Sequence, residues 1–191
     1  MRVYRINVYN HSDQVGECIC EISPANGRAR GAFKYSREYL SAPERYAIDP
    51  LHLPLSEDVF NVEHPGVFGV FVDSLPDDWG RKLLVRKKRL PRSEQNIPAL
   101  LLALGGAGLG ALMYAEDGLF PDKGEYTQST SLERLLVESE LFESGECNDD
   151  EITQLLSAGS SPGGARPKAL VQSDGKHYQS HRKTPSFRAG I

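Results

Sequence analysis

The chain has 191 residues, of which 39% are hydrophobic, and it carries a formal net charge of −4 at pH 7. This length allows one sizeable domain or two small ones, and the hydrophobic content is enough for a packed core. The negative charge argues against a protein that mainly coats nucleic acid, and no apolar run reaches the roughly 20 residues that a membrane helix needs. Because the N-terminus also lacks the pattern of a signal peptide, we expect a globular, cytoplasmic protein that contacts neither a membrane nor nucleic acid directly.

Three strands are expected near the N-terminus, at residues 3–9, 16–22 and 29–35, where polar and apolar residues alternate between turn-forming segments. The dipeptide Asn26-Gly27 between the second and third strands is a strong hairpin signal. Tyrosines and β-branched residues recur at the spacing of a small antiparallel sheet or barrel. The pattern therefore predicts a β-rich, barrel-like meander.

Residues 36–65 contain four prolines, which interrupt any regular period and predict an ordered loop with short extended pieces. We assign no chemistry to the histidines scattered through this part of the chain. Cys18 and Cys20 stand two apart in an expected strand, which is neither a metal-ligand spacing nor a disulfide framework. They and Cys147 are expected to be reduced residues that pack in the core.

An apolar run at residues 66–73 is expected to form a strand, and Asp77 or Asp78 is expected to cap the helix that follows. The apolar side of this helix consists of Trp79, Leu83, Leu84 and Leu90. The opposite side is basic and consists of Arg81, Lys82, Arg86, Lys87, Lys88, Arg89 and Arg92. Such a side can face nucleic acid or an acidic partner, but a solvated amphipathic helix is the interpretation that we favour.

A short helix is expected at residues 99–104, after Pro98, and a glycine cluster follows it. The spacing Gly106-x-Gly108-x-Gly110 differs from the dinucleotide fingerprint, and the cluster follows a helix instead of a strand. We therefore reject a dinucleotide site and expect these glycines to end the helix and allow a close approach to a neighbouring element.

Two tandem helices are expected next. Thr130 with Glu133 and Asn148 with Glu151 have the spacing of capping boxes, and each pair precedes leucines or isoleucine at helical intervals.

The segment 156–171 joins the second of these helices to an expected β-hairpin, which is signalled by Asp174-Gly175. Two serines, two adjacent glycines, an arginine and a lysine lie within it, and together they suit the binding of a phosphate group. The alternative is an ordinary connection whose glycines only cap the helix. The pattern of a P-loop is absent, so the segment is closer to the glycine-rich loop of kinases.

Three segments, in this order, resemble the N-terminal half of HipA-type toxins: residues 71–81, residues 101–105 with 108–112, and residues 160–170. The resemblance implies a bacterial serine/threonine kinase of a toxin–antitoxin module, which uses ATP and Mg²⁺ and has a helix-turn-helix, HipB-like antitoxin as its partner. The implied fold is α+β, with a β-rich subdomain at 1–105 and a partial α/β kinase N-lobe at 106–178. An all-helical C-lobe follows in the intact family, and we expect this chain to lack it.

The resemblance also implies roles for single residues. The nucleotide phosphates would be bound by Gly163, Gly164, Ala165, Arg166 and Lys168. The regulatory autophosphorylation of the family corresponds to Ser161, with Ser160 as its neighbour. A phosphate there would compete with the phosphates of the nucleotide.

One departure from the family limits these expectations. In the family, the hairpin strand after Asp-Gly-Lys carries a lysine for the nucleotide phosphates, whereas residues 179–191 show no strand period, no acidic residue and one proline. We assign no catalytic residue, regard 179–191 as an aberrant basic tail and expect no tight binding of ATP or Mg²⁺, because phosphoryl transfer needs metal, base and lysine together.

Three hypotheses follow from this. The first is the truncated N-terminal part of a kinase toxin, inactive by itself. The second is a non-catalytic interaction module that binds an antitoxin or a separate kinase chain. The third is one piece of a split enzyme whose C-terminal part is encoded downstream.

Overall fold

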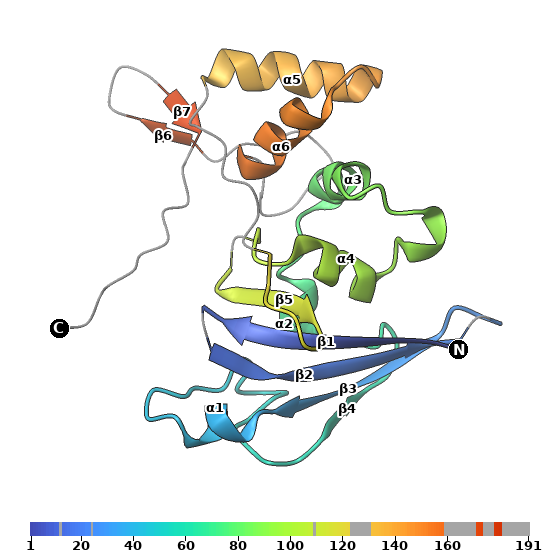
Figure 1. Ribbon diagram of the computed structural model, residues 1–191, viewed down its shortest axis with the longest axis vertical. Coiled ribbons are helices and arrows are strands. Elements are labelled where there is room, and N and C mark those ends of the chain that lie inside the picture. The colour runs from blue at the N-terminus through green and yellow to red at the C-terminus, as the bar shows by residue number, and fades with distance from the viewer. Residues whose placement is uncertain are drawn as a thin grey trace. The chain divides into compact units, whose positions relative to one another are not determined.

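The computed structural model describes residues 1–11, 13–23, 25–108, 110–122, 131–158, 171–173 and 178–180. The chain divides into two compact units, with residues 1–76 and 84–124 in the first and residues 77–83 and 125–191 in the second. Figure 1 shows a mixture of helices and antiparallel strands, so the expected α+β class is confirmed. Within the described part of the chain, no helix has the length and apolar character needed to cross a membrane.

The first unit is built on one antiparallel sheet with the strand order β4-β3-β2-β1-β5. Its strands are β1 (Arg2–Asn10), β2 (Asp13–Ile22), β3 (Ala29–Tyr35), β4 (Phe60–Val62) and β5 (Leu112–Glu116). The first four follow one another as a meander, and β5 joins the other side of β1. The three strands expected near the N-terminus are therefore confirmed, and the Asn26-Gly27 turn joins the second to the third.

One face of this sheet forms the core of the first unit. The register places Ile6 opposite Cys18 and Cys18 opposite Phe33, so that all three side chains point to the same face and are buried. Both cysteines of β2 are free thiols in this core, as expected. Burial, with a smaller contribution from neighbouring ionisable groups, raises the pKa of Cys18 to about 12 and that of Cys20 to about 11.

Two helices cover this face, α2 (Gly69–Val72) and α4 (Ile97–Leu104), as Figure 1 shows. The expectation of a strand at residues 66–73 was wrong. The amides of Val72 and Asp73 bond back to the carbonyls of Phe68 and Gly69, and the ring of Phe71 packs 5.4 Å from that of Phe33 in the core. A short run of consecutive apolar residues has no period that separates a strand from a helical turn.

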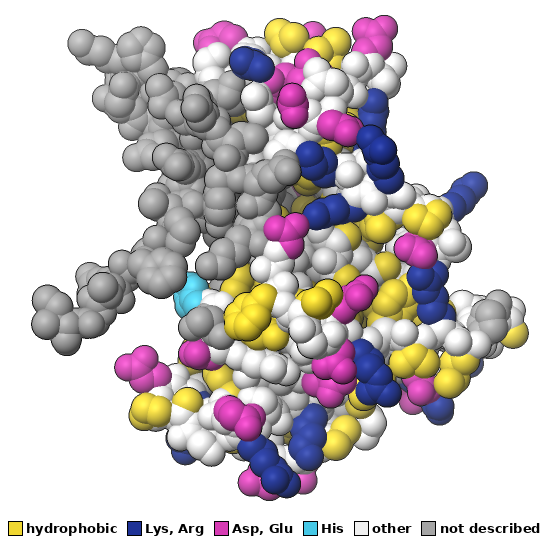
Figure 2. All heavy atoms as spheres, in the orientation of Figure 1, with side chains coloured by type: hydrophobic (Ala, Val, Ile, Leu, Met, Phe, Trp, Pro, Cys, Tyr) yellow, Lys and Arg dark blue, Asp and Glu magenta, His cyan; other side chains and the backbone are white. Residues whose placement is uncertain are grey.

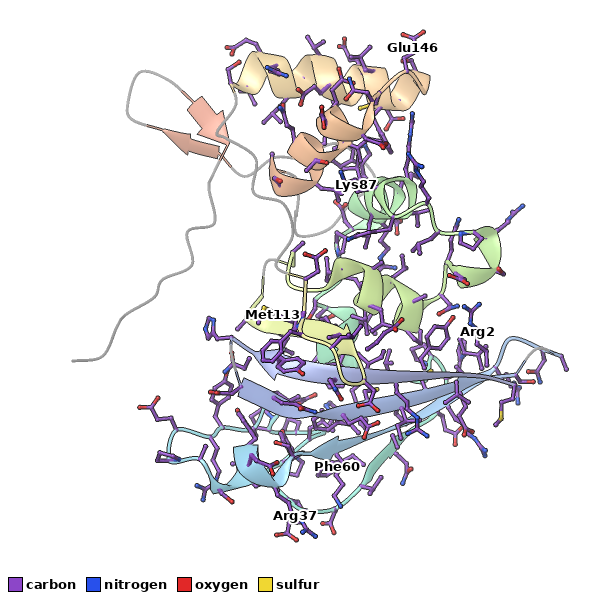
Figure 3. All side chains as sticks on the ribbon, in the orientation of Figure 1. Arg2, Arg37, Phe60, Lys87, Met113 and Glu146 are labelled. Carbon is purple, nitrogen blue, oxygen red and sulfur yellow. The ribbon has the colours of Figure 1, made fainter. Side chains whose placement is uncertain are left out.

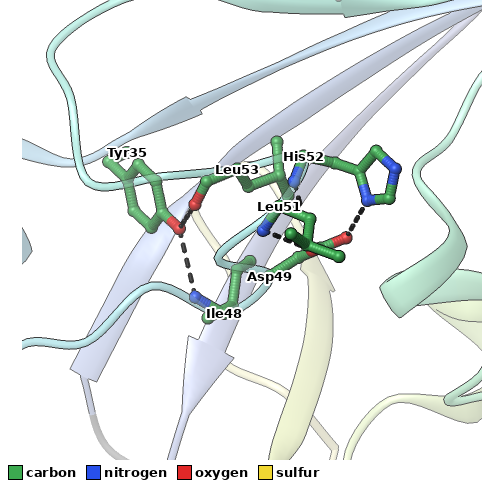
Figure 4. Close-up of polar contacts among 6 residues, drawn as sticks. All are labelled: Tyr35, Ile48, Asp49, Leu51, His52 and Leu53. Atoms are coloured by element: carbon green, nitrogen blue, oxygen red, sulfur yellow. Dashed lines mark hydrogen bonds and ion pairs between the residues drawn. The ribbon is translucent and has the colours of Figure 1, made fainter.

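The connection from β3 to β4 is an ordered loop, as expected, but it also contains the short helix α1 (Arg37–Ser41), which the sequence pattern did not predict. Ser36 caps this helix through its hydroxyl, which accepts a hydrogen bond from the amide of Tyr39 at 3.1 Å. The buried Tyr35 fixes the middle of the loop, since its hydroxyl donates to the carbonyl of Leu53 at 2.6 Å (Figure 4).

Asp49 stabilises the turn that precedes Leu53 (Figure 4). Its Oδ1 accepts hydrogen bonds from the amides of Leu51 and His52, and its Oδ2 lies 2.8 Å from Nδ1 of His52. Burial pushes the pKa of Asp49 upward, but the hydrogen bonds from His52 and Leu51 outweigh that effect and hold it below its usual value. The side chain of His52 therefore has a structural role in this turn.

The second unit contains the beginning of α3 (Asp78–Lys87) together with α5 (Leu132–Ser144) and α6 (Asp149–Ala158). From Leu84, within α3, the chain belongs to the first unit again, where a 3₁₀ turn, η1 (Arg92–Glu94), precedes α4. The core of the second unit consists of Trp79, Leu83, Leu135, Cys147, Ile152, Leu155 and Ala158.

One of the two capping boxes predicted for the second unit is present. Asn148 and Glu151 form the expected box, with Asn148 Oδ1 accepting from the Glu151 amide at 3.0 Å and Glu151 Oε2 accepting from the Asn148 amide at 2.8 Å. The cap of α5 is Ser131, whose hydroxyl accepts from the amide of Arg134 at 3.3 Å, so the expectation of a box with Glu133 was wrong by one residue. Thr130 lies outside the described residues.

The expected hairpin is present as the antiparallel pair β6 (Val171–Ser173) and β7 (Tyr178–Ser180), and β7 lies beside α5. We expected no strand period after Tyr178, and this was wrong for the next two residues. Gln179 and Ser180 belong to β7 because they continue the backbone pairing with Gln172 and Val171, which does not require alternating side chains.

Candidate functional site

The candidate phosphate loop itself lies outside the described residues. This applies to Ser160, Ser161, Gly163, Gly164, Ala165, Arg166 and Lys168. The structure describes what stands on either side, namely α6, which ends at Ala158, and β6, which begins at Val171. The expected order of helix, glycine-rich segment and hairpin is therefore confirmed, while the geometry of the loop residues stays a prediction.

The helix that leads into this loop is firmly held in the second unit. Ile152, Leu155 and Ala158 are each at most 3% exposed and pack in the core with Trp79. Because Ala158 is the last helical residue and is buried, the chain enters the glycine-rich segment from a fixed point.

A buried carboxylate connects α5 with α6. Glu138 is 3% exposed, and its Oε1 accepts a hydrogen bond from Nε of Arg134 at 2.8 Å. The side-chain amide of Gln154 on α6, oriented with its nitrogen toward the carboxylate, donates to Oε1 and Oε2 at 2.6 and 3.1 Å. The i,i+4 spacing of Arg134 and Glu138 was the sequence signal for the first contact, but nothing in the sequence indicated Gln154.

The segment 74–81, within the first motif of the resemblance, has structural roles in both units. In the second unit, Asp77 Oδ1 accepts a hydrogen bond from the amide of Gly80 at 2.8 Å, which confirms an aspartate cap for α3. The Trp79 indole is buried, and Nε1 donates to Oε1 of Glu143 on α5 at 3.0 Å. These residues therefore hold helices together.

In the first unit, the same motif contributes Ser74. The hydroxyl of Tyr114 on β5 donates a hydrogen bond to Ser74 Oγ at 2.6 Å. Burial pushes the pKa of Tyr114 well above its usual range, although the hydrogen bond to Ser74 acts in the opposite direction. This pair connects the segment before α3 with the sheet.

The glycine cluster after α4 is also structural. Gly105 ends α4 with a φ of 55°, and a Cβ at this position would lie 2.8 Å from the carbonyl oxygen of Asp122. The amide of Gly106 donates to the same oxygen at 2.7 Å. The interpretation that these glycines end a helix and allow a close approach is confirmed.

The charges on the described surface do not converge on one centre. No three His, Cys, Asp or Glu side chains are grouped for a metal ion in the described part of the chain. On the basic side of α3, where dark blue side chains gather in Figure 2, Lys88 pairs with Asp122 at 3.2 Å. A shallow depression next to the β2–β3 hairpin contains both glutamates and arginines, and Arg30 is paired there with Glu21 at 2.8 Å.

The first unit is an α+β domain. It consists of a four-stranded meander, the added strand β5 and the covering helices α2 and α4, and the chain then continues into a helical unit. Residues 6–115 match the model of the HipA N-terminal domain, which is more than half of the chain. The chain therefore belongs to the HipA N-terminal domain family. No curated protein matches it. The matched residues include two of the three segments on which the resemblance was based, and they end before the glycine-rich loop.

Proposed function

We propose that the chain is the N-terminal part of a HipA-like serine/threonine kinase toxin, located in the cytoplasm. In this proposal its glycine-rich segment binds nucleotide phosphates weakly and the chain alone does not transfer them. The observation that carries the proposal is the HipA N-terminal domain at 6–115, followed by α6 and the β6–β7 pair on either side of the loop.

The loop residues suit phosphate but not a metal ion. Adjacent Gly163 and Gly164 allow the backbone amides to approach an anion, and Arg166 and Lys168 add positive charge. Residues 159–170 contain no carboxylate, so Mg²⁺ would need ligands from elsewhere. ATP with Mg²⁺ would supply the transferable phosphoryl group, while this chain's contribution is to hold and orient the phosphates.

Two residues of the same loop are the proposed regulatory sites. Phosphorylation of Ser161, or of its neighbour Ser160, would place a nearly dianionic group among the loop amides and beside Arg166. That group would compete with the nucleotide for the same donors.

The residues of β7 support the proposal that the chain alone does not transfer a phosphoryl group. In the family this hairpin strand carries the lysine for the nucleotide phosphates, whereas β7 consists of Tyr178, Gln179 and Ser180. A phosphate cradle without that lysine supplies binding but little of the positioning and charge that phosphoryl transfer needs.

The test compares nucleotide binding and transfer in the full chain. We expect weak binding of a fluorescent ATP analogue that is lost in an Arg166→Ala/Lys168→Ala variant. Binding should be kept in Lys34→Ala/Arg37→Ala, which removes the same charge from an exposed part of the first unit. With labelled ATP and Mg²⁺ we expect no label on Ser160 or Ser161. We also expect none on an added aminoacyl-tRNA synthetase, the substrate class that the resemblance to HipA-type toxins implies. Robust labelling would overturn the proposal that the chain alone is inactive. Equal binding by the unchanged chain and both double variants would overturn the proposal that the loop binds the nucleotide.

A second candidate function is an interaction module for a helix-turn-helix, HipB-like antitoxin or for a separate kinase chain. It is favoured by the position of the family match, because residues 6–115 lie almost entirely in the first unit, which has a core of its own. Co-expression of the full chain with such an antitoxin should give a complex that the Arg166→Ala/Lys168→Ala variant also forms. A complex that depends on these loop residues would contradict this candidate.

A further inference from the structure

Two large apolar side chains lie next to each other on the outer side of α5. Leu136 is 58% exposed and Val137 is 56% exposed, while Leu135, Glu138 and Ser139 on the inner side of the helix are buried. Single exposed aliphatic residues are common on protein surfaces, but an adjacent pair on one helix offers a continuous apolar contact.

Acidic residues surround this pair. Glu133 precedes Leu136 and Val137 by one helical turn, and Glu140 follows them by one turn, and both are exposed. Figure 2 shows apolar side chains between acidic ones along α5 at the top of the view, and Figure 3 shows Glu146 just beyond the end of the helix. We call Glu133, Leu136, Val137 and Glu140 the α5 outer face.

The helical hairpin of α5 and α6 is strongly acidic. Residues 131–158 contain eight acidic residues and a single basic one, Arg134. Arg134 is bonded to the buried Glu138 through Nε at 2.8 Å, so its charge is matched on the inner side of α5. The potential over the α5 outer face is therefore negative, and it repels nucleic acids and anionic lipid headgroups.

We propose that the α5 outer face binds a segment of a partner protein in which lysines or arginines stand on both sides of one or two large apolar side chains. The apolar side chains would cover Leu136 and Val137, and the cations would pair with Glu133 and Glu140. An apolar segment without cations would leave the carboxylate of Glu140 partly desolvated without a compensating charge, which is unfavourable. The charges set the orientation and the association rate, and the apolar contact supplies most of the affinity.

A synthetic peptide tests this inference on the full chain. The probe is a short fluorescein-labelled helical peptide with leucines at i and i+4, flanked by lysine and arginine. In fluorescence anisotropy, Leu136→Ser/Val137→Ser should weaken its binding roughly tenfold or more, because a large share of the apolar contact is lost. Glu133→Gln/Glu140→Gln should weaken binding severalfold and flatten its dependence on salt. Amide NMR shifts on adding the peptide should concentrate in residues 132–144.

Matched controls separate this site from general attraction to an acidic protein. Leu51→Ser/Val59→Ser removes two exposed apolar residues from the first unit, and Glu44→Gln/Glu57→Gln removes two exposed acids there. Both controls should bind the probe as the unchanged chain does. The inference is overturned if the probe does not bind, if the controls weaken binding as much as the α5 variants, or if the α5 variants instead abolish self-association of the chain. It does not depend on the nucleotide loop, so the Arg166→Ala/Lys168→Ala variant should bind the probe normally.

Discussion

The indole Nε1 of Trp79 donates a hydrogen bond to Oε1 of Glu143 at 3.0 Å, across 64 positions of the sequence. The ring is 2% exposed and meets Phe142 edge-on at 5.9 Å. One residue of the first family-like motif is therefore fixed to α5 by both an apolar and a polar contact. The role that follows for Trp79 is to assemble the helical unit that leads to the glycine-rich loop.

Replacing Trp79 should destabilise the second unit in two steps. Trp79→Phe keeps an aromatic ring but loses the hydrogen bond and some volume, and should cost about 1–2 kcal/mol. Trp79→Ala empties the centre of the core and should cost about 3–5 kcal/mol. Urea denaturation followed by circular dichroism measures both, since the variants lack the only tryptophan and cannot report by its fluorescence.

Glu143→Gln is the control for this prediction. It retains an acceptor oxygen for Nε1 and should change stability by only a few tenths of a kcal/mol, because the site is exposed on its other side. A loss in Glu143→Gln as large as in Trp79→Phe would contradict the view that packing contributes most.

Removing the hydrogen bond between Ser74 and Tyr114 should cost different amounts of stability, depending on which of the two residues is replaced. Tyr114→Phe leaves Ser74 Oγ with its contact to the carbonyl of Val70 at 3.3 Å, and should cost about 0.5–1.5 kcal/mol. Ser74→Ala leaves the hydroxyl of Tyr114, a residue that is 1% exposed, without this acceptor and should cost about 1–3 kcal/mol.

Denaturant unfolding of both single variants and the double variant measures this difference. The double variant should lose less than the sum of the two singles, because the unmatched hydroxyl is then absent. If Tyr114→Phe proves more costly than Ser74→Ala, the hydrogen bond is not what limits stability at this position.

The parts of the fold that could be predicted are those with a local cause. The strand at 29–35 follows from alternation in a short window, and the Asn148–Glu151 box follows from two side chains three positions apart. The helix α2 could not be predicted, because its apolar side chains pack against residues that are distant in sequence, such as Phe33.

The candidate site shows the same limit. Its residue types and its place between a helix and a hairpin could be derived from the sequence, since both flanks have local signals. The contacts that hold α6 in place could not, because the pairing of Glu138 with Gln154 depends on how two helices pack.

Alanine at Gly105 should be more costly than alanine at Gly118. Both glycines have a positive φ, of 55° and 77°, and a left-handed conformation costs an alanine about 1–2 kcal/mol. The ψ of −119° places Gly105 outside the left-handed region, where a side chain is more strained still. At Gly105 the added Cβ would also lie 2.8 Å from the carbonyl oxygen of Asp122, whereas at Gly118 it meets no atom within 4 Å. Gly105→Ala should therefore lose at least about 1 kcal/mol more in thermal or urea unfolding. Equal losses would show that neither the contact with Asp122 nor the backbone conformation of Gly105 adds to the cost.

The thiols of β2 should make the first unit sensitive to alkaline pH. The ordinary thiol pKa is 9.0, and in the fold it is about 12 for Cys18 and about 11 for Cys20, mainly because both are buried. A raised pKa of an acid means that the folded state holds its proton more tightly than the unfolded state. The resulting stability is complete below pH 9 and is lost as the pH rises from 9 toward 12, on the order of 1.4 kcal/mol for each pKa unit.

The urea midpoint should accordingly stay level from pH 7 to about 8.5 and fall between pH 9 and 10, below the range in which buried tyrosines titrate. A Cys18→Ala/Cys20→Ala variant is less stable at pH 7, but its midpoint should fall much less over that interval. Reaction with a thiol reagent gives an independent check, because the neutral buried thiols should react only through unfolding. If the variant and the unchanged chain lose stability in parallel above pH 9, other groups cause the alkaline sensitivity.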